Sequence, residues 1–448
     1  MNATLAAALD TSGTRPSLRD PKLVRHDIEA IVRLAVFGDA QERRFARYAI
    51  HAAAPQLGAV PSSIAVLYAA RGRGEVSGFT VPAVNIRGMA FDMSRALFRA
   101  MQSTGAAATV FELARSEMGY TFQDPAEIAC VVLAAAIAEG YEGPVFIQGD
   151  HFQANAKKFA TDPEGETKAL EDLIRAAVAA QFYCIDIDAS TLVDLSYERV
   201  ADQQAPNAKL TARLAKLVRD IEPKGVTVSV GGEIGEVGKN NSTVEELTAY
   251  IDGFRDIVGP RFEGVSKVSV QTGTTHGGIP LPDGTIAKVA IDFDTLQEMS
   301  RVSRERYGMA GAVQHGASTL PDELFHRFPE VETAEIHLAT GFQNLVMDHP
   351  KFPTDLVKEM HAYCDRDLAG ERSAGETDLQ FFYKTRKKAW GPFKQQTWDL
   401  PAGLRAELSK TLQDKFEFLI RQLKAGEMRE TTLRYVNHAP VEVVPPVS

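Results

Sequence analysis

The chain has 448 residues, of which 44% are hydrophobic and 24% are charged, and this balance excludes an extensively disordered protein. Lysine and arginine total 49 against 59 aspartate and glutamate residues, so the net charge is -10 and no long basic block occurs. Nucleic-acid binding is therefore not expected. The sequence contains no apolar run of about 18 residues and no signal-peptide pattern at its start, so neither membrane insertion nor export is expected.

The three cysteines are Cys130, Cys184 and Cys364. They are too few and too scattered for a disulfide framework or a cysteine zinc cluster. This cysteine usage indicates a reducing compartment, and the expected location is the cytoplasm.

Residues 1–75 form the first predicted segment, a helical N-terminal extension that includes KLVRHDIEAIVRLAV and ERRFARYAIHAAA. Eight short apolar runs follow within residues 76–350. They are FTVPAVNI (79–86), ATVFEL (108–113), VFIQG (145–149), FYCIDID (182–188), VTVSVG (226–231), SKVSVQ (266–271), GAVQ (311–314) and AEIHL (334–338). Helical stretches such as DPAEIACVVLAAAIAEG separate these runs, which is typical of parallel βα units.

Eight such units predict an α/β fold of the (β/α)8 TIM-barrel class. An open, doubly wound sheet is the alternative, but no GxGxxG motif follows the first predicted strand.

Residues 351–448 form a helical C-terminal extension that includes LRAELSKTLQDKFEFLIRQLK and ends in a loose tail, VNHAPVEVVPPVS. Such an extension either caps one end of a barrel or forms an oligomer contact.

Acidic and imidazole side chains follow several of the predicted strands. Asp150 and His151 follow the third, Glu233 the fifth, His276 the sixth and His315 the seventh. One histidine at a strand end is more often a structural residue, but the carboxyl ends of barrel strands meet at one mouth, so the three imidazoles are expected to converge. Neutral imidazoles, a carboxylate and an open position are what a catalytic zinc site requires. The sequence therefore predicts a site for Zn2+ or another divalent cation.

The motifs VPAVN, GDH, GGEIG, THGG and QHGAS occur in this order and resemble those of the class II, zinc-dependent fructose-bisphosphate aldolase family over residues 78–350. In that family the fold is a (β/α)8 barrel. The resemblance implies that His151, His276 and His315 bind the zinc ion. It also implies that Glu233 is a carboxylate that can approach the metal.

The same resemblance implies roles for residues that contact the substrate. Asp150 would protonate the aldehyde oxygen during condensation and deprotonate the hydroxyl during cleavage, and Asn85 would help to hold the enediolate. Backbone N–H groups and small hydroxyl side chains would hold a substrate phosphate. The matching positions are Gly277, Gly316, Ser318 and Thr340.

Three departures from the family pattern make this chain a divergent member. The loop GGEIGEVGKNNSTVEEL lacks the acidic pair that exchanges the proton of the substrate carbon, and Glu236 is the candidate replacement. On strand eight, EIHLATGF places His337 and Ala339 where the family shows Asn-x-Asp-Thr. Ala317 in QHGAST adds a methyl group where a phosphate would approach. These departures leave the identity of the substrate open.

The implied activity is that of a lyase which reversibly cleaves a phosphorylated ketose, fructose 1,6-bisphosphate or a related sugar phosphate, to dihydroxyacetone phosphate and an aldehyde. A homo-oligomer is expected from the resemblance.

Two alternatives stay open. The missing acidic pair and the long C-terminal extension also suit a non-catalytic supporting subunit of a tagatose-bisphosphate-type aldolase. Another zinc-dependent TIM-barrel enzyme, such as a hydrolase, is the other alternative, although the His-x-His pair common on its first strand is missing.

Overall fold

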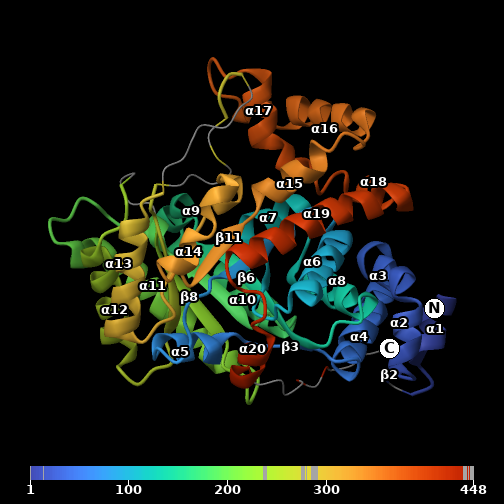
Figure 1. The fold of residues 1–448 in the computed structure, drawn as a ribbon, viewed down its shortest axis with the longest axis horizontal. Coiled ribbons are helices and arrows are strands. Elements are labelled where there is room, and N and C mark those ends of the chain that lie inside the picture. The colour runs from blue at the N-terminus through green and yellow to red at the C-terminus, as the bar shows by residue number, and fades with distance from the viewer. Residues whose placement is uncertain are drawn as a thin grey trace.

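Eight parallel strands form a closed barrel at the centre of the computed structural model, which describes residues 2–13, 15–235, 240–273, 278, 280–283, 291–436, 441 and 443 (Figure 1). The strands are β4 (Val81–Asn85), β5 (Val110–Ala114), β6 (Gly143–Gln153), β7 (Cys184–Asp188), β8 (Ser229–Gly235), β9 (Val265–Val270), β10 (Ala312–Gln314) and β11 (Glu335–Leu338). They pair in chain order, and β11 pairs with β4 to close the ring. The predicted (β/α)8 TIM barrel is confirmed, and the closing pair excludes the open sheet.

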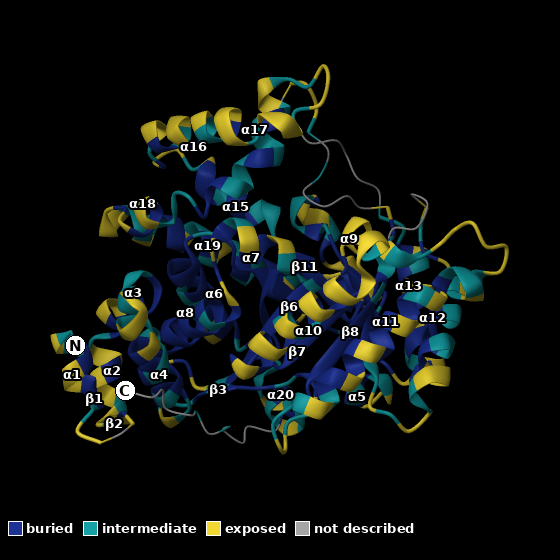
Figure 2. Cartoon of the chain, turned by 180° about the vertical axis from the view of Figure 1, so that it is seen from behind, coloured by how far each residue is buried: buried dark blue, intermediate teal, exposed yellow. Residues whose placement is uncertain are grey.

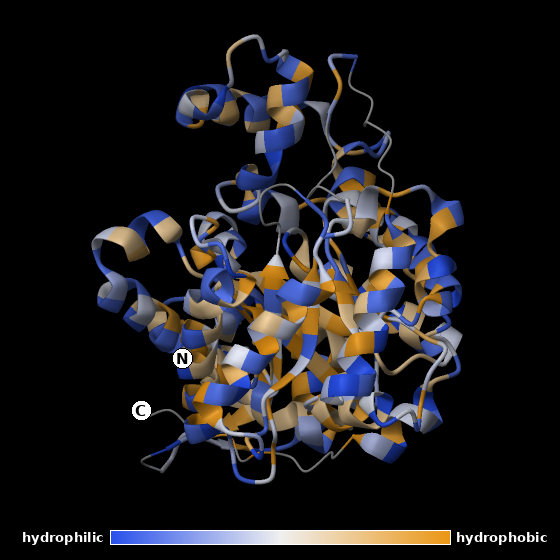
Figure 3. Ribbon diagram, turned by 90° about the vertical axis from the view of Figure 1, so that its left-hand side faces the viewer, coloured by the Kyte–Doolittle hydropathy of each residue, from blue (hydrophilic) through white to orange (hydrophobic). Residues whose placement is uncertain are grey.

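Helices separate successive strands and cover the outside of the barrel. They are α6 (Ala90–Thr104), α7 (Arg115–Thr121), α8 (Pro125–Ala138), α9 (Ala156–Thr161), α10 (Pro163–Ala179), α11 (Val200–Ile221), α12 (Val244–Val258), α13 (Phe293–Tyr307), α14 (Arg327–Glu330) and α15 (Thr340–Met347). Hydrophobic residues concentrate on the strands in the middle of the protein, and hydrophilic residues on the outer helix faces (Figure 3). The strands are correspondingly buried, and exposed residues lie on the periphery (Figure 2).

Local sequence signals set the starts of these helices. α12 begins after Thr243, whose side chain accepts the N–H of Glu246 while the Glu246 side chain accepts the N–H of Thr243, a capping box. α8 begins at Pro125, and the side chain of Asp124 caps it by accepting the N–H of Glu127 at 2.6 Å. α8 lies where the sequence predicts a helix.

The N-terminal residues pack against α8, which is apolar on nearly all sides, through the last two of their four helices. They form α1 (Ala3–Ala8), α2 (Pro21–His26), α3 (Ile28–Phe37) and α4 (Ala40–Gln56). α6 contacts α8 from another side, so this helix is enclosed as a core element (Figure 1).

Three short strands in this region were not predicted. β1 (Leu9–Asp10) and β2 (Ser17–Leu18) pair antiparallel, and β3 (Ala59–Pro61) pairs parallel with residues 143–145 at the start of β6. β6 is longer than its neighbours, so its first residues extend past the barrel and offer an edge to β3. The pairing partner of β3 lies far away in sequence, which is why a local pattern did not indicate it.

The C-terminal residues form helices at the side and over one end of the barrel. They are α16 (Thr354–Asp367), α17 (Asp378–Thr385), α18 (Lys394–Trp398), α19 (Ala402–Gln422) and α20 (Arg429–Tyr435). α19 lies along α6, where Arg405 Nη1 is 3.1 Å from Asp92 Oδ1 and Arg99 Nη2 donates to Ser409 Oγ at 2.6 Å. α16 and α17 stand over the end of the barrel (Figure 1). Most of the predicted tail, residues 436–448, lies outside the described residues.

At the opposite end, α5 (Ala65–Gly72) packs against the first residues of the strands. Above it, a layer of buried polar side chains crosses the barrel. Lys267 Nζ on β9 lies 2.9 Å from Asp186 Oδ2 on β7 and 2.7 Å from Gln148 Oε1 on β6, and it also pairs with Glu335 on β11. Tyr68 of α5 donates its hydroxyl to the same Glu335. Burial lowers the pKa of Lys267, but the two carboxylates outweigh it and raise that pKa above its usual value.

Within the described ranges, no single helix is long and apolar enough to span a membrane. α7 and α8 reach that length and apolarity only when taken together, and they are bent by 83° at their junction.

Replacing Lys267 with methionine is expected to lower the free energy of unfolding by about 3–5 kcal/mol, because Asp186 and Glu335 then remain buried without their countercharge. Denaturant unfolding of purified protein measures the loss. Lys358→Met is the matched control, because the Lys358 ammonium pairs with Asp355 at the exposed surface and is expected to change stability by less than about 1 kcal/mol. Equal stability of the two variants would contradict the structural role of Lys267.

Candidate active site

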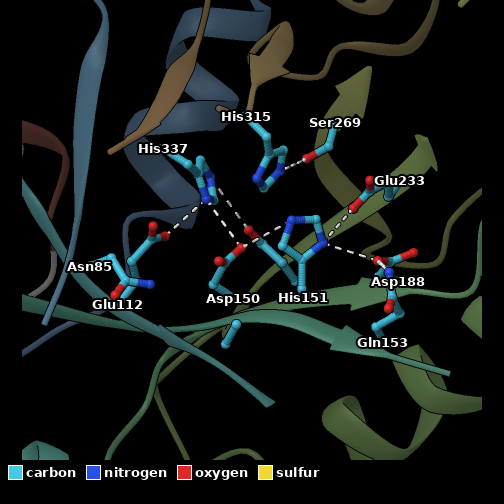
Figure 4. A network of polar contacts seen from close by, with 12 residues as sticks. Asn85, Glu112, Asp150, His151, Gln153, Asp188, Glu233, Ser269, His315 and His337 are labelled. Atoms are coloured by element: carbon cyan, nitrogen blue, oxygen red, sulfur yellow. Dashed lines mark hydrogen bonds and ion pairs between the residues drawn. The ribbon is translucent and has the colours of Figure 1, made fainter. Parts of the chain in front are cut away.

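Asp150 and His151 lie near the end of β6, where the strand departs from regular geometry. The register of β6 against β7 shifts between Gly149 and Phe152, and His151 has a φ of 39°. Neighbouring residues of a regular strand point to opposite faces, whereas this bulge lets Asp150 and His151 point into one network (Figure 4). A Cβ atom added to Gly149 would lie 2.3 Å from the ring of Phe152, so the tight bend needs glycine.

The Nδ1 atom of His151 lies between two carboxylates. It is 2.9 Å from Glu233 Oε2 on β8 and 3.0 Å from Asp188 Oδ2 at the end of β7. Gln153 Nε2 donates to the same Asp188 oxygen at 2.6 Å. The Nε2 atom of His151 lies on the other side of the ring, 4.0 Å from Asp150 Oδ1. A carboxylate that accepts one ring N–H orients the ring and directs its other nitrogen, as around metal-binding histidines.

Burial and neighbouring charges control the protonation of this group. Burial lowers the pKa of His151, but the charges of Asp150 and Glu233 raise it well above its usual value. Burial and the charge of Asp188 raise the pKa of Glu233 to about 7. Burial also opposes ionisation of Asp188, yet the hydrogen bond with His151 keeps its pKa below the usual value. Asp188 therefore carries the negative charge that holds the His151 ring.

His315 follows β10 and packs against His151, with ring centroids 4.1 Å apart. Its Nε2 atom lies 2.9 Å from Ser269 Oγ on β9 (Figure 4). One possible ligand atom from each of Asp150, His151 and His315 lies within 4.8 Å of the others. Imidazole nitrogens are suitable ligands for zinc and related divalent cations, so His151 and His315 fit the predicted ion, and the Asp150 carboxylate lies beside them.

Three of the residues that the sequence assigned to the site, Glu236, His276 and Gly277, lie outside the described residues. Glu233 lies beside Nδ1 of His151 and not in the cluster with Asp150 and His315. With His151 and Asp188 it forms a second group whose possible ligand atoms are within 4.8 Å of one another.

His337 on β11 connects this cluster to the polar layer inside the barrel. Its Nδ1 atom lies 2.9 Å from Glu112 Oε2 and 3.1 Å from Asp150 Oδ1, and its Nε2 atom lies 2.7 Å from Glu335 Oε1. Burial lowers the pKa of His337, but the charges of Glu112 and Asp150 raise it well above its usual value. Burial and the charge of Asp150 raise the pKa of Glu112 to about 7. His337 is therefore a buried cation that holds Asp150 in place.

The sequence prediction did not include His337 or Asp188 in the site. A signal existed for both. His337 stands where the related family has an asparagine that contacts substrate, and Asp188 is a carboxylate at the carboxyl end of the fourth predicted strand, like Asp150 after the third.

The predicted substrate-binding residues that the structure describes line one cavity of about 870 Å³ together with Asp150, His151 and His315. Asn85 ends β4, where its side-chain NH2 group donates to Glu117 and its Oδ1 atom accepts from Arg87 Nε at 3.1 Å.

Gly316, Ser318 and Thr340 also line this cavity. Gly316 has a φ of 70°, a left-handed conformation that favours glycine. Ser318 Oγ accepts the backbone N–H of Gly341 at 3.0 Å, and Thr340 begins α15, a helix N-terminus suited to anions.

Comparison with known proteins shows that the sequence of this chain matches one protein family. The sequence model of the family described as Fructose-bisphosphate aldolase class-II matches residues 71–390. No curated protein matches the chain.

Several solved structures are similar to this chain. A fructuronate-tagaturonate epimerase from Cohnella laeviribosi has a TM-score of 0.54 at 12% identity, covering 88% of this chain and 86% of that chain. A probable tagatose 6 phosphate kinase from Sinorhizobium meliloti has a TM-score of 0.52 at 17% identity, covering 79% and 93%. A fructose-bisphosphate aldolase from Campylobacter jejuni has a TM-score of 0.48 at 15% identity, covering 81% and 94%. At these identities the likeness to the epimerase and to the probable kinase shows the fold alone.

Gly149→Ala is expected to lower the free energy of unfolding by about 1–3 kcal/mol, because the new methyl group meets the Phe152 ring in a packed site. Thermal and denaturant unfolding measure the change. Gly403→Ala on α19 is the control, because a Cβ atom there meets nothing within 4 Å and no loss of stability is expected. If Gly149→Ala were as stable as Gly403→Ala, the tight bend would not require glycine.

Proposed function

Because the chain belongs to the class II fructose-bisphosphate aldolase family, we propose that it is a metal-dependent aldolase that reversibly cleaves a phosphorylated ketose. The products are dihydroxyacetone phosphate and an aldehyde, and the substrate is fructose 1,6-bisphosphate or a related sugar phosphate. The observation that carries this proposal is the cluster of Asp150, His151 and His315, whose possible ligand atoms lie within 4.8 Å of one another. Asp150 and His151 are neighbours on β6, His315 follows β10, and the closed barrel brings them into one cavity.

His151 and His315 would hold the cation, with His276 as a further ligand by its motif. Zinc is the proposed ion. A bound divalent cation supplies Lewis-acid polarisation of the substrate carbonyl, which stabilises the negative charge left when the carbon-carbon bond breaks. Glu233 and Asp188 accept at Nδ1 of His151 and fix the orientation of its ring.

Asp150 is the proposed proton carrier. During cleavage its carboxylate accepts the proton of the substrate hydroxyl, and during condensation it returns that proton to the aldehyde oxygen. The carboxylate is fixed for this task, because its Oδ1 atom lies 3.1 Å from Nδ1 of the charged His337. No lysine Schiff base is needed.

Other side chains bind and orient the substrate. Asn85 lines the cavity beside Asp150 and is held by Glu117, so it can hydrogen-bond the oxygens of the ketone fragment. Gly316, Ser318 and Thr340, together with Gly277, are proposed to bind a substrate phosphate. Glu236 is proposed to exchange the proton of the substrate carbon.

The two alternatives are less well supported. A supporting subunit has no need for Asp150, His151 and His315 to be grouped in one cavity, and this grouping supports an enzyme. A hydrolase that uses metal-bound hydroxide does not account for Asn85 and the phosphate positions beside the cluster. Self-association, a cytoplasmic location and the division at residues 75 and 350 stay predictions of the sequence.

Asp150→Asn is expected to lower kcat for ketose phosphate cleavage by roughly two to four orders of magnitude, because an amide cannot accept the hydroxyl proton. Steady-state kinetics measures the rate. Product analysis by NMR distinguishes cleavage, which gives two fragments, from inversion at a carbon that carries a hydroxyl group, which gives an epimer of the substrate. The metal content of the variant, determined by elemental analysis, is expected to stay unchanged. Asp256→Asn, a change on the exposed face of α12, serves as the control. Normal turnover by Asp150→Asn would remove Asp150 from the proposed mechanism.

Removing the metal is expected to abolish cleavage and to leave the barrel folded, because the strands are held by backbone pairing and a large apolar core. Activity assays and circular dichroism before and after treatment with a chelator, followed by addition of zinc, test this. Turnover that is indifferent to the chelator, in protein shown to be free of metal, would overturn the proposed function.

A further inference from the structure

The short 3-10 helix η5 (Arg386–Ala389) follows α17 and carries a cation into the mouth of the cavity. Its neighbours are neutralised, because Arg386 pairs with Asp348 and Lys388 Nζ lies 2.6 Å from Glu371 Oε1. Lys387 differs from them. It lines the cavity, and no carboxylate in the described part of the chain lies within 4.0 Å of its ammonium group.

Arg87, which follows β4, lines the same cavity and is only 7% exposed. Its Nε atom donates to Asn85 Oδ1 at 3.1 Å, and its Nη2 atom donates to Glu117 Oε1 at 2.6 Å. Its Nη1 atom is buried and has no hydrogen-bond partner among the residues placed by the structure. A buried N–H group without an acceptor costs free energy, so a ligand that accepts from it would bind favourably.

The charges around these two residues do not balance. Burial and the positive charge of Arg87 lower the pKa of Lys387, and Glu117 only partly opposes them. Glu117 is already paired with Arg87. Arg87 and Lys387 therefore share one carboxylate, and the ammonium group of Lys387 is left for a ligand to neutralise.

Close packing fixes η5 against the barrel. A Cβ atom added to Gly88, next to Arg87, would lie 2.4 Å from the ring of Trp390. Trp390 Nε1 also donates to Gln343 Oε1 at 3.1 Å, and Lys394 Nζ lies 2.6 Å from Glu127 Oε1 on α8. The C-terminal helices thus hold Lys387 over the barrel by contacts on several elements.

We infer that Arg87 and Lys387 together bind an anionic group of the substrate, a phosphate or a carboxylate, so that the C-terminal extension supplies part of the substrate pocket. The inference rests on the proposed function, because the anion belongs to the substrate that the aldolase cleaves. A guanidinium group and an ammonium group give such an anion charge-assisted hydrogen bonds from two sides. A substrate that is neutral at this position would leave Arg87 Nη1 without an acceptor.

The test compares Lys387→Met with Lys388→Met, the same change on the neighbouring residue of η5, where the ammonium is already paired with Glu371. Calorimetric titration with inorganic phosphate and with glycerate measures anion binding without any turnover. Lys387→Met is expected to weaken binding of the preferred anion by roughly 10- to 100-fold, and Lys388→Met to leave it unchanged. Lys387→Arg is expected to restore most of the affinity. If binding of inorganic phosphate weakens more, the anionic group of the substrate is a phosphate. If binding of glycerate weakens more, that group is a carboxylate.

Steady-state kinetics on zinc-loaded enzyme provides the second readout. For ketoses that carry a terminal phosphate or carboxylate, Lys387→Met is expected to raise KM by a similar factor, and for a ketose with a neutral terminus it is expected to match Lys388→Met. If the wild type cleaves no ketose but Lys387→Met loses anion binding, the proposed function fails and the anion site stands. If cleavage is observed and the two variants behave alike in both assays, or if the wild type binds neither anion, the anion site is wrong.

Discussion

The ion pairs of Lys267 with Asp186 and Glu335 are the constraint on which the interior of the barrel depends. A buried carboxylate without a countercharge costs several kcal/mol, so these groups are tolerated only because the ammonium lies between them. The three residues come from β7, β9 and β11, and Gln148 adds a hydrogen bond from β6. The layer therefore fixes how the inward side chains of four strands meet beneath the cavity.

The same layer reaches the chemistry of the site through His337. Glu335 is shared between Lys267 and His337, and His337 in turn contacts Glu112 and Asp150. Because each proton and charge in this chain of contacts affects the next, the groups that stabilise the barrel interior also set the electrostatic surroundings of the proposed proton carrier. Stability and the proposed proton transfer thus depend on one network in this protein.

The sequence predicted features that local patterns determine. Apolar runs separated by helical stretches predicted all eight barrel strands, and the rings of His151 and His315, which were expected to converge because strand ends share one mouth, pack against each other. It did not predict the bulge in β6, since a register shift depends on the neighbouring strands. The contacts of Asp188 and His337 and the place of Lys387 in the cavity were also not predicted, because they bring together elements that are distant in the chain, including a helix beyond the barrel.

The positive φ of His151 has a consequence for engineering this protein. A left-handed conformation in a residue other than glycine costs about 1 kcal/mol or more, which the surrounding structure must offset. Glycine at this position would relieve that cost and would also delete the imidazole. Selection for heat resistance alone would therefore favour sequences that fold better and have lost the proposed ligand, so a screen for improved variants needs an activity readout at every round.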